Sequence, residues 1–317
     1  MHPALIVLLA IVGLLIVLTP GLLISTHVVY KEAFYVKRLE KQERSFLKGE
    51  QYIVFQDEIK KDVDEVLAEP YEEISIASHD GKRLQGYLYI FNPESKKVQI
   101  QFHGYKGEGR KSMGGYLQSA KENGLNCIIT DHRSHGKSEG HIVTYGIKER
   151  KDVKKWVEKA IEIFGEDCEI LLRGISMGGA TVLSSLDTNL PSNVKGVISD
   201  CPFCSPIDEL TKIAVEEKTK MPEKPARLML ILAARIWAHF NVLESSAEKA
   251  VMNSNIPILL FHGDDDRFVP YAFSQRIAKA NPSIRFITIP GAGHGLCKYK
   301  DPVTFKKEVN QFIKQYL

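Results

Sequence analysis

The sequence predicts an α/β protein with a mostly parallel sheet of eight strands flanked by helices. Short apolar runs at 98–102, 126–130, 169–173, 195–199, 256–261 and 285–289 are separated by helical stretches, which is the pattern of parallel strands joined by crossover helices. An alternating segment at 72–91, with a turn at 78–81, predicts an antiparallel hairpin that begins the sheet. At 169–181 a strand, a glycine-rich turn and a helix follow one another without a spacer.

The first element along the chain is an apolar segment. No charged residue occurs from Pro3 to Thr26, and residues 4–18 are almost all Leu, Ile, Val and Ala. Because about 20 such residues span a bilayer core of about 30 Å, residues 1–29 are predicted to form a transmembrane anchor, with a cleaved signal peptide as the alternative. The positive-inside bias then predicts a single-pass membrane protein with its main domain in the cytoplasm, or a secreted protein if the segment is cleaved. The basic residues behind this prediction are Lys31, Lys37, Arg38, Lys41, Arg44 and Lys48.

The rest of the chain divides into a connector and one large domain. Residues 30–70 are charge-rich with scattered apolar residues and are interpreted as a helical connector, and 71–317 form the α/β domain. The insertion at about 201–255 is too long for a plain loop and predicts a short cap. Its amphipathic helices are expected at 206–220 and 226–240.

Charge and cysteine content exclude some classes of function. The chain has 42 basic and 39 acidic residues for a net charge of +3, which gives no reason to expect nucleic-acid binding. Its five cysteines are scattered and do not form a disulfide framework. Cys201 and Cys204 form a lone C-x-x-C without a second ligand pair, and this pair is interpreted as a loop entering the cap rather than as a metal or redox site.

Ser176 is the candidate nucleophile. It is the middle residue of the Gly-Ile-Ser-Met-Gly turn, where glycines at 174 and 178 let strand and helix approach closely and the serine side chain is pushed outward. A bare G-x-S-x-G also occurs in ordinary glycine-rich loops, so the strand before it and the helix after it carry the prediction.

A nucleophilic serine needs a histidine base and a carboxylate that orients the base. In a strand-turn-helix setting the acid and then the histidine follow the serine in the chain. His294 lies in a glycine loop after the strand at 285–289 and follows a strand-end acidic loop. The residues alone leave several acids open, namely Asp264, Asp265 and Asp266 in that loop and Asp200 at the end of another strand.

Taken together, these motifs resemble those of the α/β-hydrolase superfamily from about residue 74 to the C-terminus. The resemblance is carried by His103-Gly104, by the Asp131 to Ser138 segment, by the serine turn, by His262-Gly263 with its acidic loop, and by Gly293-His294. More closely, the chain resembles bacterial single-domain serine esterases and serine-aminopeptidase-like hydrolases with a short helical cap. The family pattern H-G-x-x-D-x-x-V-P runs from His262 to Pro270, which implies Asp266 as the triad acid.

The resemblance also implies an oxyanion hole. In this fold the loop after the strand at 98–102 supplies one donor, which here is the backbone N–H of Tyr105. The second donor is the N–H of Met177, because the residue after the nucleophile begins a helix and directs its amide at the developing negative charge.

The function expected from these features is hydrolysis of carboxylic ester-type acyl bonds through an acyl-enzyme, without a cofactor or metal. The expected partners are a small acyl ester substrate and, through the N-terminal helix, a membrane, with no nucleic acid. A peptidase acting on short peptides is the alternative within the fold, and a non-catalytic membrane-tethered binding module is the alternative outside it. The sequence leaves the oligomeric state open.

Overall fold

The computed structural model describes residues 2–37, 49–219 and 221–317, and of residues 8–18 and 217–219 it describes the backbone alone. The strands are β1 (Glu72–Ala77), β2 (Arg83–Tyr89), β3 (Lys97–Phe102), β4 (Asn126–Thr130), β5 (Glu169–Ile175), β6 (Val194–Asp200), β7 (Ile258–Gly263) and β8 (Arg285–Ile289). The α-helices are α1 (Pro3–Ala33), α2 (Glu50–Ile53), α3 (Gln56–Ala68), α4 (Gly109–Ser112), α5 (Gly114–Glu122), α6 (Glu149–Phe164), α7 (Met177–Ser184), α8 (Pro206–Ile213), α9 (Glu223–Ile236), α10 (Ala247–Val251), α11 (Tyr271–Ala280), α12 (Cys297–Lys300) and α13 (Pro302–Tyr316).

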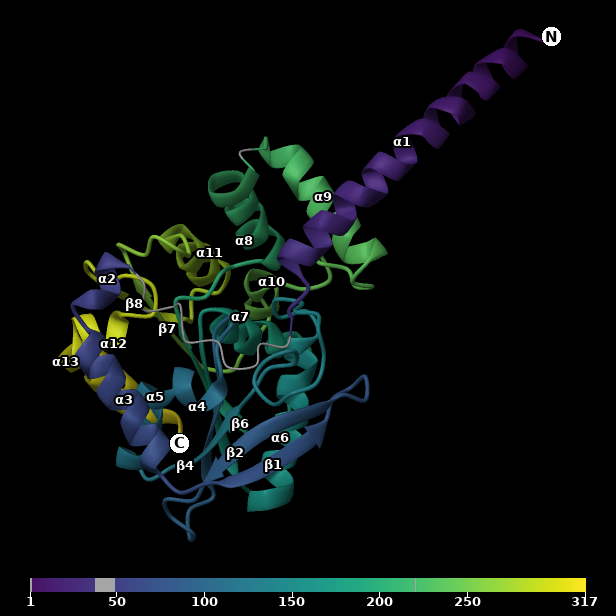
Figure 1. Ribbon diagram of the computed structural model, residues 1–317. Coiled ribbons are helices and arrows are strands. Elements are labelled where there is room, and N and C mark those ends of the chain that lie inside the picture. Colours follow the sequence, from purple (N-terminus) through teal and green to yellow (C-terminus); the bar gives the residue numbers. More distant parts are fainter. Residues whose placement is uncertain (1, 38–48, 220) are drawn as a thin grey trace.

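Over the described ranges, these strands form a single sheet of eight in the order β1-β2-β4-β3-β5-β6-β7-β8 (Figure 1). β1 and β2 form the predicted hairpin, and β2 is also antiparallel to β4. All pairings from β4 through β3 to β8 are parallel. The predicted α/β fold with a mostly parallel eight-stranded sheet is therefore confirmed, and the parallel strands end at one common edge.

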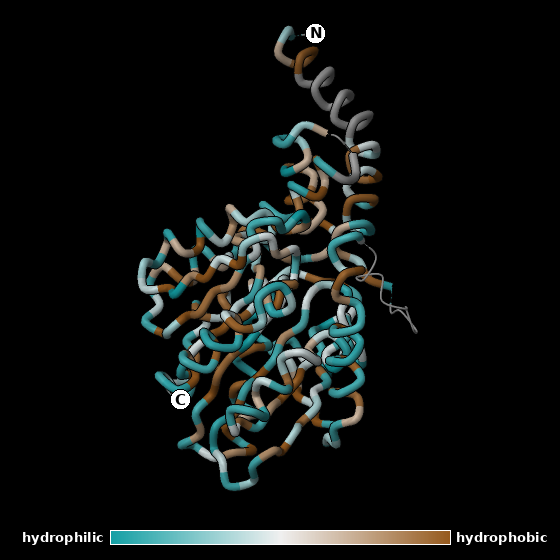
Figure 2. Tube along the Cα trace, turned by 90° about the vertical axis from the view of Figure 1, so that its left-hand side faces the viewer, coloured by the Kyte–Doolittle hydropathy of each residue, from teal (hydrophilic) through white to brown (hydrophobic). Residues whose placement is uncertain are grey.

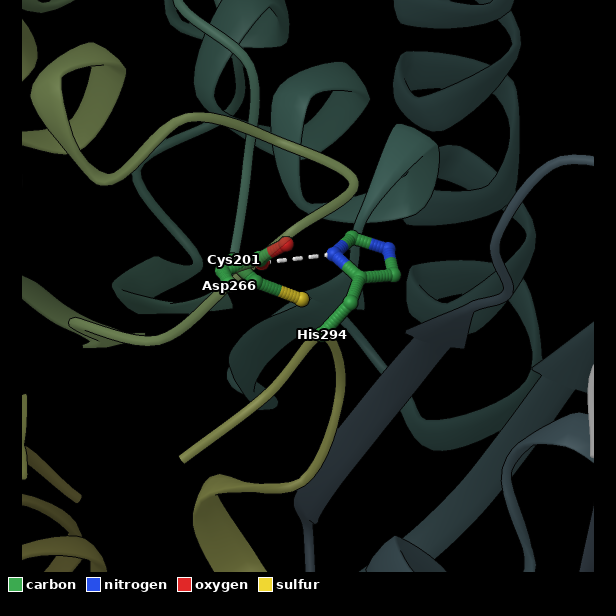
Figure 3. A group of neighbouring side chains, drawn as sticks. All are labelled: Cys201, Asp266 and His294. Atoms are coloured by element: carbon green, nitrogen blue, oxygen red, sulfur yellow. Dashed lines mark hydrogen bonds and ion pairs between the residues drawn. The ribbon is translucent and has the colours of Figure 1, made fainter. Parts of the chain in front are cut away.

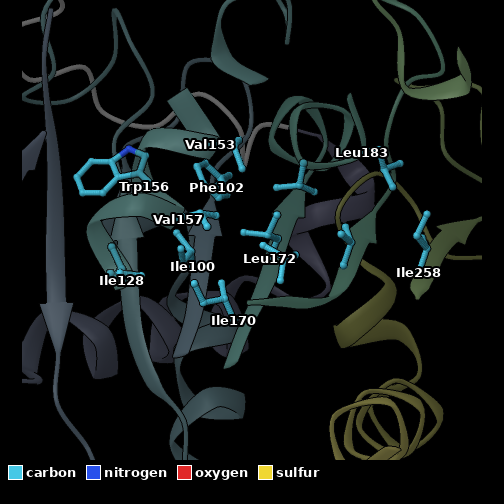
Figure 4. Close-up of a cluster of buried hydrophobic side chains, with 14 of the residues drawn as sticks. Ile100, Phe102, Ile128, Val153, Trp156, Val157, Ile170, Leu172, Leu183 and Ile258 are labelled. Carbon is cyan, nitrogen blue, oxygen red and sulfur yellow. The ribbon is translucent and has the colours of Figure 1, made fainter. Parts of the chain in front are cut away.

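Helices cover both faces of the sheet. On one face, Trp156 and its neighbours on α6 pack with residues of α7, α10 and α11 against alternate residues of the central strands, such as Ile100 and Leu172 (Figure 4). On the other face, α3, α5 and α13 contribute Val66, Leu117, Phe312 and further residues to a second cluster. Because both faces are buried, the central strands are apolar on both sides, and this explains the apolar runs in the sequence.

The insertion after β6 is helical, as predicted. α8 continues into a π-helical turn over Ala214–Thr219, and α9 follows it. Residue 220, the last of the first predicted cap helix, lies outside the described residues. Asp208 of α8 pairs with Arg227 of α9 at 2.7 Å and with Arg276 of α11 at 3.0 Å, so ion pairs fasten the cap to the main domain.

The transmembrane anchor predicted for residues 1–29 is wrong, and so is the single-pass membrane location deduced from it. Among the described residues, no helix combines the length and the apolar character needed to cross a membrane. α1 runs from Pro3 to Ala33 and projects from the domain beside the cap helix α9 (Figures 1 and 2). Its C-terminal part packs on α9, where the fully buried Thr26 accepts a hydrogen bond from Trp237 Nε1 at 3.1 Å. In this part of α1, polar and aromatic side chains contact the cap. The average hydropathy of the segment does not reveal such contacts.

The segment that follows α1 returns to the main domain. Phe34 is fully buried against Tyr145 and Phe240, and Tyr35 forms an isolated antiparallel bridge with Ile142. The predicted connector contains α2 and α3, and its part at 38–48 lies outside the described residues.

Candidate active site

Ser176 occupies a sharp turn between β5, which ends at Ile175, and α7, which begins at Met177. Its backbone has φ 55° and ψ −120°, a conformation that is strained for a residue with a side chain. A Cβ at Gly174 would lie 2.2 Å from the carbonyl oxygen of Gly178, and one at Gly178 would lie 2.0 Å from that of Phe102. Only glycine fits at both positions, so strand and helix approach closely and hold the serine at the edge of the sheet.

Ser176, His294 and Asp266 form a continuous chain of hydrogen bonds. Ser176 Oγ lies 2.9 Å from His294 Nε2, and His294 Nδ1 lies 2.7 Å from Asp266 Oδ2. Because an ionised carboxylate only accepts hydrogen bonds, the ring proton of a neutral His294 sits on Nδ1 and Nε2 is left to accept from the serine. The three residues come from the ends of β5, β7 and β8, which meet at one edge of the sheet.

The other acids that the sequence left open do not contact His294 in this arrangement. Asp200 is buried below the serine turn, where its carboxylate accepts a hydrogen bond from Tyr116 at 3.0 Å. Asp264 accepts from the backbone N–H of Gly291 at 2.6 Å, and Asp265 turns outward to Arg267. The structure thus brings Asp266, and none of these three, to the histidine.

Asp266 is held by several donors at once. Its Oδ1 accepts from the backbone N–H groups of Phe268 and Val269, at 2.9 and 2.8 Å. Its Oδ2 accepts from His294 and also from Nε2 of the fully buried His262, at 3.1 Å. Burial acts to raise the pKa of the Asp266 carboxyl, but the charge of His294 and the hydrogen bonds from both imidazoles outweigh burial and hold this pKa well below its usual range.

The pKa of His294 moves in the opposite direction. Burial disfavours the imidazolium, but Cys201 and Asp266 favour it, and the pKa of His294 is raised well above 6.5. Burial also raises the pKa of the Cys201 thiol to about 11, so this thiol keeps its proton at neutral pH. The Asp266 carboxylate is therefore the charge that stabilises a protonated His294.

The loop after β3 lies beside the serine. A Cβ at Gly104 would lie 3.4 Å from Ser176 Cβ, which places Tyr105 next to the candidate nucleophile. Buried imidazoles hold this loop, because His135 Nε2 accepts from the backbone N–H of Lys106 at 3.1 Å. Burial lowers the pKa of His135 to about 4, so its ring stays neutral and able to accept. The Met177 amide directly follows the serine and stands in the first turn of α7, where backbone N–H groups have no partner within the helix.

Sequence reasoning missed several neighbours of the site. Gln51 and Tyr52 of α2 contact the acid loop and the histidine loop, and no motif marks them because their partners lie more than 200 residues away in the chain. In the sequence, His262 was considered only as the first residue of the family pattern that runs to Pro270. Its H-x-x-x-D spacing could have suggested a contact with Asp266. Within the described part of the chain, one group can hold a metal ion, namely Cys201, Asp266 and His294 (Figure 3).

The family assignment rests on a direct comparison. The family model described as "Serine aminopeptidase, S33" matches residues 93–254, slightly more than half of the chain. The chain therefore belongs to this family of α/β hydrolases. The match includes Ser176 and the cap, and it ends before Asp266 and His294.

Individual relatives are similar to about three quarters of the chain. The uncharacterized protein YqkD of Bacillus subtilis is 25% identical over 240 residues, which cover 75% of this chain and 77% of YqkD. The α/β-hydrolase domain-containing protein WAV2 of Arabidopsis thaliana is 24% identical over 255 residues, covering 78% of this chain and 79% of WAV2. A solved structure of the Pyrococcus furiosus esterase Pf2001 superposes with a TM-score of 0.62 at 21% identity, covering 90% of this chain and 98% of the esterase. This last likeness shows the shared fold.

Proposed function

We propose that this α/β hydrolase cleaves carboxylic ester-type acyl bonds, with Ser176 as nucleophile, His294 as general base and then acid, and Asp266 as the orienting acid. The observation that carries the proposal is the hydrogen-bonded chain from Ser176 Oγ through both ring nitrogens of His294 to Asp266 Oδ2, at 2.9 and 2.7 Å. The strained backbone of Ser176 supports it, because strain of this kind occurs where a reactive side chain must be presented.

In the proposed first step, Ser176 Oγ attacks the ester carbonyl carbon while its proton moves to His294 Nε2. The Asp266 carboxylate stabilises the imidazolium that forms, and the backbone N–H groups of Tyr105 and Met177 donate to the oxyanion. When the tetrahedral intermediate collapses, His294 returns the proton to the leaving alkoxide, and the acyl group remains on Ser176.

In the second step, a water molecule repeats this chemistry. Nε2 of His294 takes a proton from the water, whose oxygen attacks the acyl carbonyl, and the same two amides hold the oxyanion. His294 then protonates Ser176 Oγ as the carboxylic acid is released. Neither step requires a metal or a cofactor.

The setting of the serine turn supports an ester over a peptide. Residues of the loop after β4, the start of the cap and α8 belong to the same buried apolar cluster as Met177, which follows Ser176; they are Val143, Tyr145, Phe203, Ile207 and Leu210. The residues described in this cluster offer no charged group that would hold the terminus of a peptide. The family description favours a peptidase as the second candidate, because it names an aminopeptidase.

Two measurements test the proposal together. A fluorophosphonate probe should label the wild-type protein and leave Ser176→Ala unlabelled, because the probe reacts with an activated serine. The value of kcat/KM for short to medium acyl p-nitrophenyl esters should greatly exceed that for aminoacyl anilides. Equal or higher values for an anilide would replace the esterase proposal by the peptidase, and equal labelling of the two proteins would remove Ser176 from the mechanism.

A further inference from the structure

A buried thiol lies against the His294–Asp266 pair. Cys201 directly follows β6, its side chain is fully buried, and its backbone N–H donates to the carbonyl of Phe261 on β7 at 2.9 Å. One ligand atom each from Cys201, Asp266 and His294 lies within 4.8 Å of the others. Figure 3 shows the sulfur and the carboxylate on the same side of the imidazole ring, next to the nitrogen that contacts Asp266.

From this arrangement we propose that Cys201, Asp266 and His294 form an inhibitory site for a thiophilic divalent cation such as Zn²⁺ or Cd²⁺. Thiolate, imidazole and carboxylate are all zinc ligands, and three protein ligands leave a fourth position for water. The thiolate favours these ions over Mg²⁺ and Ca²⁺, which prefer oxygen ligands. The site itself rests on geometry, and its inhibitory effect rests on the proposed function.

The distances are close to those that a tetrahedral ion needs. Bond lengths of about 2.0–2.3 Å place neighbouring ligand atoms of a tetrahedral zinc site about 3.3–3.7 Å apart. The contact between His294 Nδ1 and Asp266 Oδ2, now 2.7 Å, therefore has to open by about half an ångström. The sulfur lies within 4.8 Å of both partners and needs a shift of about 1 Å at most.

Charge also suits a divalent ion. On binding, the Cys201 thiol releases its proton to solvent, and a protonated His294 releases one as well, so that the thiolate and the Asp266 carboxylate supply two negative charges. Together with a neutral His294, they balance the charge of one divalent cation. A neutral cluster of this kind avoids the cost of an uncompensated charge in a buried place.

Inhibition follows from which nitrogen of the His294 ring carries the proton. In the proposed mechanism Nδ1 carries the ring proton and Nε2 accepts the proton of Ser176. A cation on Nδ1 forces the remaining proton of a neutral ring onto Nε2, where it blocks acceptance from the serine. The bound ion therefore stops the first step without touching Ser176.

The C-x-x-C spacing did not reveal this group. Cys204 is not one of its members, and its Sγ lies 3.8 Å from Asp208 Oδ2 at the base of the cap. The partners of Cys201 are 65 and 93 residues further along the chain. Cys204→Ala is accordingly a matched control, because it removes a buried thiol from the same loop and leaves the proposed ligands intact.

The test titrates the metal-stripped full-length protein with Zn²⁺, Cd²⁺ and Mg²⁺ and compares each variant with its own metal-free rate. Zn²⁺ should inhibit p-nitrophenyl ester hydrolysis by the wild type and by Cys204→Ala, EDTA should reverse the inhibition, and Mg²⁺ should have no effect. In Cys201→Ala and Cys201→Ser the half-inhibiting Zn²⁺ concentration should rise roughly 100-fold or more, because even outer-shell partners of a metal contribute about 10- to 100-fold.

A second readout is independent of activity. Cd²⁺ should produce the ultraviolet charge-transfer band of a metal thiolate, at one equivalent, in the wild type and Cys204→Ala but not in the Cys201 variants. If this band is absent from the wild type, or if Zn²⁺ inhibits the Cys201 variants as strongly as the wild type, the metal site is overturned. If the band appears but no ester is hydrolysed even without metal, the metal site stands and the proposed function fails.

Discussion

At the scale of single residues, Asp266 is the most constrained member of the site. One of its oxygens receives two backbone amides, and the other receives the imidazoles of His294 and His262. His262 is itself fixed, because its Nε2 lies 3.1 Å from both Asp266 Oδ2 and the carbonyl of Val269, which only accept, so Nε2 carries the proton. Its Nδ1 then accepts from Ser274 Oγ at 2.6 Å. His262 is therefore a positioning residue that acts through the carboxylate.

Replacing His262 should slow turnover without weakening substrate binding. A hydrogen bond to a charged group contributes about 1.5–3 kcal/mol, so His262→Ala should lower kcat about 10- to 100-fold and leave KM nearly unchanged. His262→Gln keeps an N–H donor and should recover part of the rate. Steady-state kinetics over a range of pH checks this, and a kcat within twofold of wild type in His262→Ala would contradict the positioning role.

The raised pKa of His294 predicts how activity depends on pH. The base must be neutral to accept a proton, so kcat/KM should fall as pH drops through the pKa of His294 in the free enzyme, with a midpoint above 6.5. Asp266→Asn removes the charge that favours the imidazolium, so the midpoint should move to lower pH while the rate falls by about 10⁴. A midpoint that stays in place in Asp266→Asn would mean that another group sets the profile.

At the scale of elements, α2 reaches the site from the N-terminal side of the domain. Tyr52 donates from its hydroxyl to the backbone carbonyl of His294 at 2.9 Å. Gln51 donates from Nε2 to the backbone oxygen and side chain of Asp265, at 3.0 and 2.9 Å. This short helix thus holds the loops that carry the candidate base and the candidate acid.

Removing one of these contacts should cost activity. A neutral hydrogen bond contributes about 0.5–1.5 kcal/mol, so Tyr52→Phe should lower kcat about 2- to 10-fold through looser placement of His294. Tyr316→Phe is the matched control, because Tyr316 is 36% exposed near the C-terminus. Kinetics and thermal unfolding should be measured side by side. If Tyr52→Phe loses stability but keeps its full kcat, α2 is a purely structural contact.

Elements could be predicted from the sequence where the information is local. The hairpin, the strand before Ser176 and the helix after it follow from turn residues and apolar runs, and the strand ends predicted that Ser176, His294 and an acidic loop meet at one edge. Asp266 was selected among several acids only by its resemblance to the family pattern. The contacts of Tyr52, Gln51 and Cys201 could not be predicted in this way, because each depends on pairing between segments distant in the chain. The prediction for the N-terminal helix failed for the same reason, because the C-terminal part of α1 contacts Trp237, which lies in the cap.

At the scale of the whole molecule, Arg133 joins three parts of the fold. Its side chain is 2% exposed and pairs with Asp152 of α6 at 2.7 Å and with Asp80 in the hairpin turn at 3.1 Å. The Asp152 side chain is only 5% exposed. The hairpin turn, the loop after β4 and α6 are therefore linked through one buried cation.

Removal of this cation should destabilise the fold strongly. Arg133→Met removes the guanidinium from the buried Asp152 carboxylate and leaves it, among the described residues, only the contact with His79 Nδ1 at 3.3 Å. Breaking a buried pair in this way costs about 3–5 kcal/mol. Lys155→Met is the control, because Lys155 and Glu158 form an exposed pair, with both side chains 41% accessible, whose loss should cost less than about 1 kcal/mol. Urea unfolding measures both values, and equal losses in the two variants would contradict this assignment.

The central claim, that Ser176 is acylated with the help of His294, is tested most directly by trapping the acyl-enzyme. The protein is mixed with a p-nitrophenyl ester, quenched in acid within the first turnover, digested, and mapped by mass spectrometry. We predict one acyl group per chain on the peptide that contains Ser176, none in Ser176→Ala, and acylation slowed by several orders of magnitude in His294→Gln. Acylation of another residue, or ester turnover that persists in Ser176→Ala, would contradict the account.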